Sequence, residues 1–207
     1  MCDGIAAEYA QNIKKLNFVH NFDEDILTTT RNMAKRYRCG GSHSQCVENT
    51  ALQLFDVMKK NHGLSGRDRL LLRIAAIIHG CGKFISTRNV SASAYNIVMA
   101  TEILGLSHEE RKLVAEVVRS HEQEFDYVEE DTRAAKLTAL LRLANALDSS
   151  HKQKTAECKM TVKNGELVIA CSYDGDMSVE LLAVGLCQDF FEEIFGIKPV
   201  LKKKRRS

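Results

Sequence analysis

Apolar residues recur every three or four positions over most of the first 150 residues, a spacing that places them on one face of an α-helix. The chain contains a single proline, Pro199, so few helices are interrupted. The pattern predicts a mainly helical protein with seven helices before residue 155. Their approximate spans are 4–16, 23–37, 43–61, 66–79, 90–104, 108–121 and 132–149.

Several of these helices have recognisable ends. Ser107 and Glu110 have the spacing of a capping box, Ser65 and Asp68 form a weaker version, and Asp131 can cap the helix that follows it. Glycines stand where preceding helices should stop, at Gly63, Gly80, Gly82 and Gly105.

The pattern changes after about Lys154. The segment CKMTVKNGELVIACSY alternates apolar and polar residues around Asn164-Gly165, which is typical of a tight hairpin turn. A helix is predicted from about Ser178 to Phe195, and IKPVLK then offers a short strand in which Pro199 is tolerated only near a sheet edge. The helical stripe is formed by Val179, Leu182, Leu186, Phe190 and Ile194. The predicted fold class is mainly α: a helical bundle followed by a small ββαβ layer, α+β overall.

The composition suits one domain with an appended layer. Of the 207 residues, 44% are hydrophobic, enough to bury a core. No apolar run approaches the roughly 20 residues that span a bilayer, and MCDGIAAEYA lacks the pattern of a secretory signal. We therefore expect a soluble, cytoplasmic protein without membrane contacts.

The seven cysteines are scattered, include no C-x-x-C pair and are odd in number. This pattern predicts neither a disulfide framework nor a thiolate zinc site, but reduced thiols in a reducing compartment.

The formal charge of +2 conceals an asymmetry. The closing LKKKRRS holds five cations, so the remaining chain has 24 Lys and Arg against 27 Asp and Glu. Any polyanion site in the folded body must then be a local cluster. The tail could bind nucleic acid or another polyanion by charge alone, but a solvated terminus is the more common role, and nucleic acid is not the expected partner.

Histidines and polar residues near helix ends raise the question of a metal. His43, His79, His121 and the Asn145/Asp148 pair could meet in the fold, but Gly80 and Asn145 stand where carboxylates would hold a hard cation. Three interpretations remain open: histidines that cap helices or fill hydrogen-bonding roles, histidines that line an anion groove, and a catalytic metal site.

Six cations are candidates for such an anion groove, because each falls near a helix end that carries a histidine or an Asn/Ser cluster. They are Lys83, Arg88, Arg119, Arg142, Lys152 and Lys154. The run HEQEFDYVEED is predicted to be a solvated loop that repels phosphate. The sequence contains none of the short signatures of P-loops, dinucleotide folds, zinc proteases or serine hydrolases.

Four ordered phrases of the chain resemble the helical C-terminal domain of the exopolyphosphatase / guanosine pentaphosphate phosphatase family. They are HSQCVENTALQLFD, RLLLRIAAIIHGCGKFI, SAYNIVMATEILGLSHEERKLVAEVVRSH and TALLRLANALDSSH. The phrases RNMAKRYR and FFEEIFGIKPVLK extend the resemblance over nearly the whole chain.

That domain is similar to the HD superfamily of metal-dependent phosphohydrolases. Carried over by position, His43 and His79 match the first two ligands, Gly80 replaces the aspartate of the His-Asp pair, and Asn145 replaces the last aspartate. Two of the four ligands are therefore missing. We expect no metal at these positions, and His121 and Asp148 are the alternative ligands if one is retained.

The resemblance implies a domain organisation and a function. Residues 1–155 are expected to form the HD-like domain, with 1–20 resembling the junction after an actin-like module, 156–201 the small layer, and 202–207 the basic tail. In that family the actin-like module, with Mg²⁺, hydrolyses the phosphate chain, so this chain alone is expected to have no catalytic residue and no cofactor. Its implied roles are binding of polyphosphate or a related phosphate polyanion and homodimerisation. The alternative is a metal-dependent HD-type phosphohydrolase acting on nucleotides or polyphosphate.

Overall fold

The computed structural model describes residues 22–122, 132–173 and 175–203. Helices form its first part, in the order α2 (Phe22–Arg36), α3 (Ser42–Val57), α4 (Lys59–His62), α5 (Gly66–Ile78), the 3₁₀ turn η1 (Cys81–Phe84), α6 (Val90–Ala100), α7 (His108–Ser120) and α8 (Thr132–Ala146). The second part contains β1 (Lys159–Lys163), β2 (Glu166–Cys171), α9 (Ser178–Phe195) and β3 (Lys198–Lys203). The predicted mainly α, α+β fold is confirmed. The expected helix at 4–16 and the cap at Asp131 lie outside the described residues.

Local sequence signals set the starts of α5 and α7. Both capping boxes are present, at Ser65 with Asp68 and at Ser107 with Glu110. The helix predicted at 43–61 is interrupted at Met58, where α3 ends and α4 begins. None of the helices in the described parts of the chain is long and apolar enough to cross a membrane.

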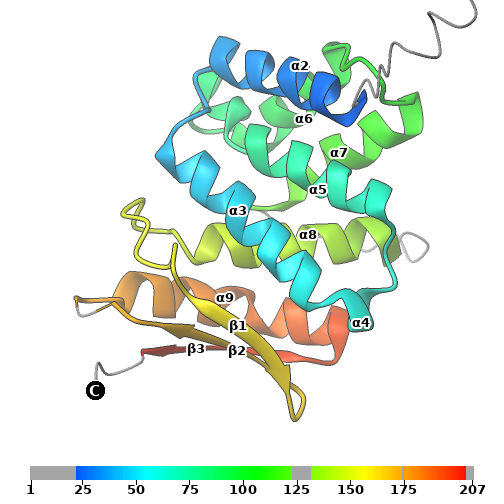
Figure 1. Ribbon diagram of the computed structural model, residues 1–207. Coiled ribbons are helices and arrows are strands. Elements are labelled where there is room, and N and C mark those ends of the chain that lie inside the picture. The colour runs from blue at the N-terminus through cyan, green and yellow to red at the C-terminus, as the bar shows by residue number, and fades with distance from the viewer. Residues whose placement is uncertain (1–21, 123–131, 174, 204–207) are drawn as a thin grey trace, which may run out of the picture.

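Helix α5 forms the centre of the helical part. It contacts α2, α3, α7 and α8, as Figure 1 also shows. Leu71, Ile74 and Ile78 are each at most 1% exposed, and apolar residues cover most of its circumference. A helix that is apolar nearly all round is stable only when other helices surround it, so the run RLLLRIAAII determines which helix lies inside.

The three strands form one sheet in the order β1-β2-β3. Strands β1 and β2 are an antiparallel hairpin, while β3 returns parallel to β2 after α9. Asn164 and Gly165 have φ values of 52° and 77°, as the predicted tight turn requires. The prediction that Pro199 lies near an edge is confirmed, because β3 is an edge strand. Helix α9 lies between this sheet and α8 (Figure 1).

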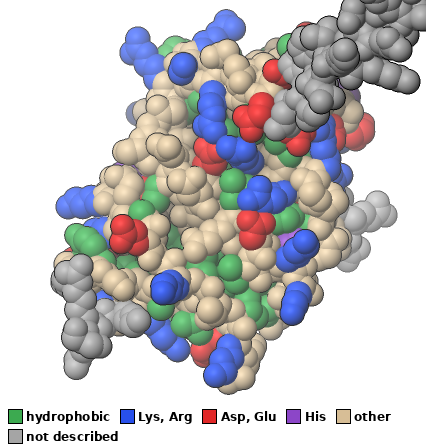
Figure 2. Space-filling view, in the orientation of Figure 1, with side chains coloured by type: hydrophobic (Ala, Val, Ile, Leu, Met, Phe, Trp, Pro, Cys, Tyr) green, Lys and Arg blue, Asp and Glu red, His purple; other side chains and the backbone are tan. Residues whose placement is uncertain are grey.

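The outer face of the sheet is basic. The strand register places Lys159 and Lys202 on either side of Ala170, and Lys163 and Lys198 on either side of Glu166. Figure 2 shows Lys and Arg side chains spread over the lower part of this view, where Figure 1 draws the strands. Lysines on exposed strands prevent edge-to-edge association of sheets.

The apolar stripe of α9 does not all face the core. Phe190 and Ile194 pack against the core, whereas Val179, Leu182 and Leu186 are 47%, 68% and 80% exposed. Val184 and Phe191, which lie outside the predicted stripe, supply the buried contacts instead. Periodicity therefore predicted the helix correctly but not the direction in which its first half points.

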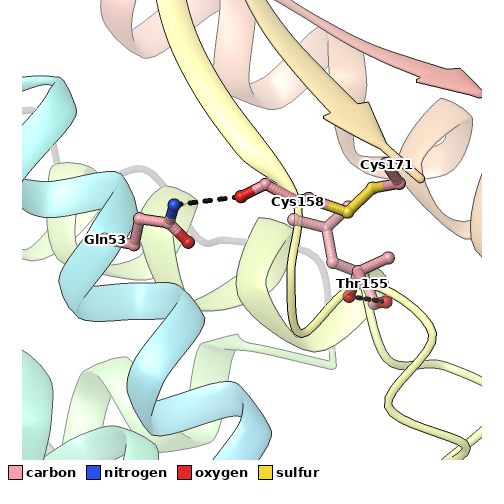
Figure 3. The surroundings of a disulfide bond; sticks show 5 residues. Gln53, Thr155, Cys158 and Cys171 are labelled. Atoms are coloured by element: carbon pink, nitrogen blue, oxygen red, sulfur yellow. Dashed lines mark hydrogen bonds between the residues drawn. A yellow bond between two sulfur atoms is a disulfide. The ribbon is translucent and has the colours of Figure 1, made fainter. Parts of the chain in front are cut away.

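Two of the seven cysteines form a disulfide bond, Cys158–Cys171, at the open end of the hairpin (Figure 3). The prediction of reduced thiols is wrong for this pair. Lys159 pairs with Ala170 across the hairpin. Cys158 directly precedes Lys159 and Cys171 directly follows Ala170, so the two cysteines lie opposite each other, with Cα atoms 4.2 Å apart. Gln53 of α3 donates to the Cys158 carbonyl at 3.1 Å, which joins this end of the sheet to the helical part.

Candidate functional site

A cleft of about 590 Å³ lies at the N-terminal end of α3, and we call it the α3 cleft. Its wall combines the segment before α3, the turn η1 and the loop after α8. The charged and ionisable residues that line it are Arg38, Cys39, His43, His79, Lys83 and His151, together with Tyr37. No carboxylate is found among the described residues that line this cleft.

The first turn of α3 opens into the cleft with backbone donors that the helix itself does not use. Gly41 is its N-cap residue, in an extended conformation, and glycine has no side chain with which to cap a helix. The first turn, Ser42 to Ser44, contains no acidic residue. A helix N-terminus carries unsatisfied N–H groups and a positive partial charge, so an anion at this position would be stabilised.

A buried carboxylate fixes the orientation of His43. Asp148 is 0% exposed and its Oδ2 accepts a hydrogen bond from Nδ1 of His43 at 2.8 Å. The same carboxylate accepts from the backbone N–H of Gln153 at 2.7 Å. Nε2 of His43 therefore points away from Asp148, 3.1 Å from Oδ1 of Asn145 and 3.3 Å from Nε2 of His79.

His79 and His121 lie behind His43 and are buried. Nδ1 of His79 donates a hydrogen bond to the carbonyl of Ala76 at 2.7 Å, and Nδ1 of His121 is hydrogen-bonded to the carbonyl of Val118. Burial, together with the neighbouring His121, lowers the pKa of His79 to about 3, so this ring is neutral. The two rings meet edge to face, with centroids 5.3 Å apart.

His151 covers His43 from the loop after α8. The two rings are stacked, with centroids 3.7 Å apart and planes 3° from parallel. His151 has a φ of 55°, in the left-handed region that costs a non-glycine residue energy, and the loop is held by bonds from Thr155 to Leu147 and from Lys154 to Glu180. Burial and the nearby His43 lower the pKa of His151.

A second cleft of about 380 Å³ adjoins the first. The two share Gly40, Gly41 and Ser44, so they form one continuous groove beside the start of α3. Arg31 and Lys35 of α2 line this second part. Among the described residues that line this second cleft, Glu48 is the one acidic residue. It is buried and accepts hydrogen bonds from Arg31 and Arg73 at 2.8–3.2 Å.

The donor set does not fit a divalent metal. The carboxylate beside His43, that of Asp148, is occupied by His43 and Gln153, and Asn145 offers only a neutral amide. The described residues contain no group of three or more His, Cys, Asp or Glu side chains arranged to hold a metal ion. The expectation that no metal binds at His43, His79, Gly80 and Asn145 stays a prediction.

A nucleophilic thiol is not offered by the cleft either. Burial raises the pKa of Cys39, which lines the α3 cleft, to about 11, so its sulfur stays protonated at neutral pH. The cleft thus offers an anion the backbone N–H groups at the start of α3 together with Arg38 and Lys83.

Residues 27–186 match the family model of the Ppx/GppA phosphatases, domain III. The chain belongs to the Ppx/GppA phosphatase family. No curated protein sequence matches it. The resemblance drawn from the ordered sequence phrases is thereby confirmed.

Within this Ppx/GppA domain, the six cations predicted from sequence do not gather at one site. Lys83 lines the α3 cleft, and its Nζ lies 3.5 Å from Oε1 of Glu122. Arg88 and Lys152 are exposed in the loops that follow η1 and α8. The assignment of all six to polyphosphate binding stays a prediction.

The other three cations already have partners inside the domain. Arg119 is 2.8 Å from Glu116, and Arg142 donates to the carbonyl of Ser120 at 2.7 and 2.9 Å. Lys154 forms a buried ion pair with Glu180 at 3.0 Å. The Lys154–Glu180 pair is buried, so breaking it to bind a ligand would cost energy and Lys154 is poorly placed to hold phosphate.

Sequence patterns did not point to three cations of the groove. Arg31, Lys35 and Arg38 precede the first histidine of the site in TRNMAKRYRCGGSH, and only folding brings them beside Lys83. The signal that could have found them is Gly40-Gly41 directly before a helix, because glycines there leave the first turn accessible to a ligand.

Proposed function

We propose that this chain is the phosphate-polyanion-binding and dimerisation module of a Ppx/GppA phosphatase, and that polyphosphate binds in the groove beside the start of α3. Hydrolysis of the phosphate chain is assigned to the actin-like module of the family and not to this domain. Family membership supports the phosphatase context, and the groove supports the ligand.

The observation that carries the proposal is the charge of the α3 cleft. Phosphate oxygens placed at the N-terminus of α3 could accept from its backbone N–H groups while Arg38 and Lys83 approach from the two sides. The adjoining cleft with Arg31 and Lys35 would take the next phosphates of a linear chain. An extended groove suits a linear polymer better than a compact ligand.

The test is calorimetric titration of the chain with polyphosphate at two salt concentrations. Because phosphate contacts release counterions, affinity should fall steeply as salt rises. Arg38→Ala and Lys83→Ala should each weaken binding by about tenfold, which corresponds to about 1.4 kcal/mol. Lys163→Ala, which removes an exposed lysine from the outer face of the sheet, is the matched control and should bind like the unmodified chain.

Two further measurements separate the groove from the basic tail and from a metal site. A chain that ends at Lys203 lacks the last cations of the tail and should keep most of its affinity; loss of all binding in that variant would contradict the proposal. Equal affinity of the Arg38→Ala, Lys83→Ala and Lys163→Ala variants would contradict it as well. Release of phosphate by the chain with added Mn²⁺ or Zn²⁺ would instead favour the HD-type phosphohydrolase.

A further inference from the structure

An exposed aromatic side chain lies in the wall of the α3 cleft. Phe84 lines the cleft next to Lys83 and is 50% exposed. Tyr37 belongs to the same wall, and its ring meets that of Phe84 edge to face, with centroids 5.7 Å apart. Polyphosphate has no apolar group, and the face of an aromatic ring is negative, so a chain of phosphates gains nothing from these rings.

The turn that carries Phe84 is fixed by its packing. The turn η1 lies against α6, and the backbone of α6 is so close to Gly82 that no Cβ atom would fit there. Within the turn, the N–H groups of Lys83 and Ile85 donate to the carbonyls of Gly80 and Gly82 at 3.2 and 3.1 Å. Phe84 therefore keeps its place without a ligand, and a flat apolar group that covers its ring would be stabilised by the area removed from water.

Cations surround the second aromatic residue of the wall. The segment KRYR, residues 35–38, places Tyr37 between basic residues. Arg38 lines the α3 cleft and Lys35 lines the adjoining cleft, while the guanidinium carbon of Arg36 is 5.8 Å from the centre of the Tyr37 ring. Basic residues interleaved with aromatic ones are typical of sites for single-stranded nucleic acid, in which cations contact phosphates and rings stack on bases.

The carboxylates near the groove are already paired with cations. Glu48 accepts hydrogen bonds from two arginines, and Glu122 lies 3.5 Å from Lys83. Lys35 and Arg38 are both exposed. Net charge alone did not favour nucleic acid as a partner, but folding gathers these cations in one groove and leaves it positive.

We propose that the groove beside the start of α3 also binds single-stranded nucleic acid, with backbone phosphates at Arg38 and Lys83 and a base stacked on Phe84. The proposal rests on the groove of the proposed function and adds a second class of ligand. The adjoining cleft, with Lys35, takes the next phosphate, so the ligand is a strand and not a single nucleotide. The strand must be unpaired, because the faces of paired bases are covered by their neighbours in the stack.

The first experiment measures fluorescence anisotropy of labelled oligoadenylate of about 12 nucleotides, as RNA and as DNA, titrated with the full chain. Phe84→Ala should weaken binding by about tenfold through the lost stacking. Phe84→Tyr retains an aromatic ring and should bind like the unmodified chain. Phe22→Ala is the matched control, because Phe22 is 59% exposed at the opposite end of α2 from Tyr37, and it should also bind like the unmodified chain.

The second experiment repeats the titrations with polyphosphate and with a duplex of the same length. Phe84→Ala should keep the affinity of the unmodified chain for both, because neither ligand presents the face of a base. Retained affinity for polyphosphate also shows that the groove of this variant is folded. Arg38→Ala should weaken the binding of oligoadenylate and of polyphosphate alike, since both place phosphate there. The basic tail is present in every variant, so differences between variants report on the groove.

The outcomes separate this inference from the proposed function. Oligoadenylate binding that depends on Phe84, without any binding of polyphosphate, would refute the proposed ligand but support the nucleic-acid site. Equal affinity of Phe84→Ala and the unmodified chain for oligoadenylate would overturn the nucleic-acid site. A Phe84→Ala variant that loses both ligands would overturn it as well, because the ring would then only support the cleft. Adenosine monophosphate that binds as tightly as the oligonucleotide would contradict a strand. A preference between the RNA and DNA probes identifies the kind of strand.

Discussion

At the scale of single residues, His62 illustrates how the backbone fixes the charge of an imidazole. Its Nε2 donates to the carbonyl of Phe55 at 2.9 Å, and its Nδ1 accepts from the N–H of Leu64 at 2.8 Å. Since Nδ1 must be unprotonated to accept, the folded chain holds this ring neutral. Burial lowers the pKa of His62, which acts in the same direction.

This arrangement predicts that acid destabilises the domain. Below the ordinary histidine pKa of about 6.5, His62 is protonated in the unfolded chain but stays neutral in the folded chain. The unfolded state therefore binds more protons, and the free energy of unfolding falls as pH falls. The slope reaches up to about 1.4 kcal/mol per pH unit for one such group, and His79, whose pKa is about 3, acts in the same direction. Urea unfolding at about pH 7.5 and about pH 5 measures the difference across this range.

A pair of variants assigns part of that slope to His62. His62→Asn retains an acceptor for the N–H of Leu64 but cannot be protonated, so the loss of stability on acidification should be smaller than in the unmodified chain. His108→Asn changes an exposed histidine and should leave the loss as it was. An undiminished loss in His62→Asn would show that this residue does not drive the effect.

The chemistry of the candidate site was only partly predictable at this scale. The sequence identified His43, His79, His121, Asn145 and Asp148 as residues that could meet. It could not show that Asp148 rather than Asn145 is the hydrogen-bond partner of Nδ1 of His43, nor that His151 stacks on the His43 ring. These partners lie more than 100 residues away from His43, and local periodicity carries no information about contacts at such separations.

At the scale of secondary structure elements, the junction between η1 and α6 depends on Gly82. A Cβ atom at this residue would overlap the carbonyl oxygen of Val90 and lie 2.9 Å from the nitrogen of Ala94, both backbone atoms of α6. Because backbone atoms cannot rotate away, the two elements would have to separate. Gly80, two residues earlier, has only the Cβ of Cys39 at 3.5 Å, an ordinary contact.

We therefore expect Gly82→Ala to destabilise the domain by about 2 kcal/mol or more through this overlap. Gly80→Ala should change stability by less than about 1 kcal/mol, because the added methyl group finds room. Denaturant midpoints of the two variants measure the difference. Similar midpoints would mean that η1 and α6 can separate at little cost.

Elements with a local signal were predicted well. The capping boxes fixed the starts of α5 and α7, and Asn164-Gly165 fixed the hairpin. The turn η1 and the break at Met58 have no comparable signal, and both were missed. The exposure of Leu182 and Leu186 on α9 was also missed, since an apolar stripe looks the same in sequence whether or not it faces the core.

At the scale of the whole molecule, a buried ion pair joins the helical part to the layer. Lys154 precedes β1 and Glu180 lies on α9; their side chains are 7% and 0% exposed and 3.0 Å apart. Glu180 also accepts from the N–H of Ser150 at 3.3 Å. Burial alone would raise the pKa of Glu180, but these two bonds outweigh burial and lower it.

We expect Glu180→Gln to destabilise the chain by about 3 kcal/mol, because it leaves the ammonium of Lys154 buried without its countercharge. Since α8 and the sheet share α9, helix content and near-ultraviolet signals should be lost in one transition. Glu193→Gln removes an acid from the other end of the same helix and should cost little. Two separate transitions would show that the layer unfolds independently.

The sequence by itself determined the mainly helical fold, the hairpin, the edge strand with Pro199 and the family phrases, because each depends on spacing or on residues close together in the chain. Tertiary structure alone decided the groove beside α3, the Cys158–Cys171 bond and the exposure of Leu182 and Leu186. The physical reason is that charge, burial and bonding at these places arise between segments that meet only after folding.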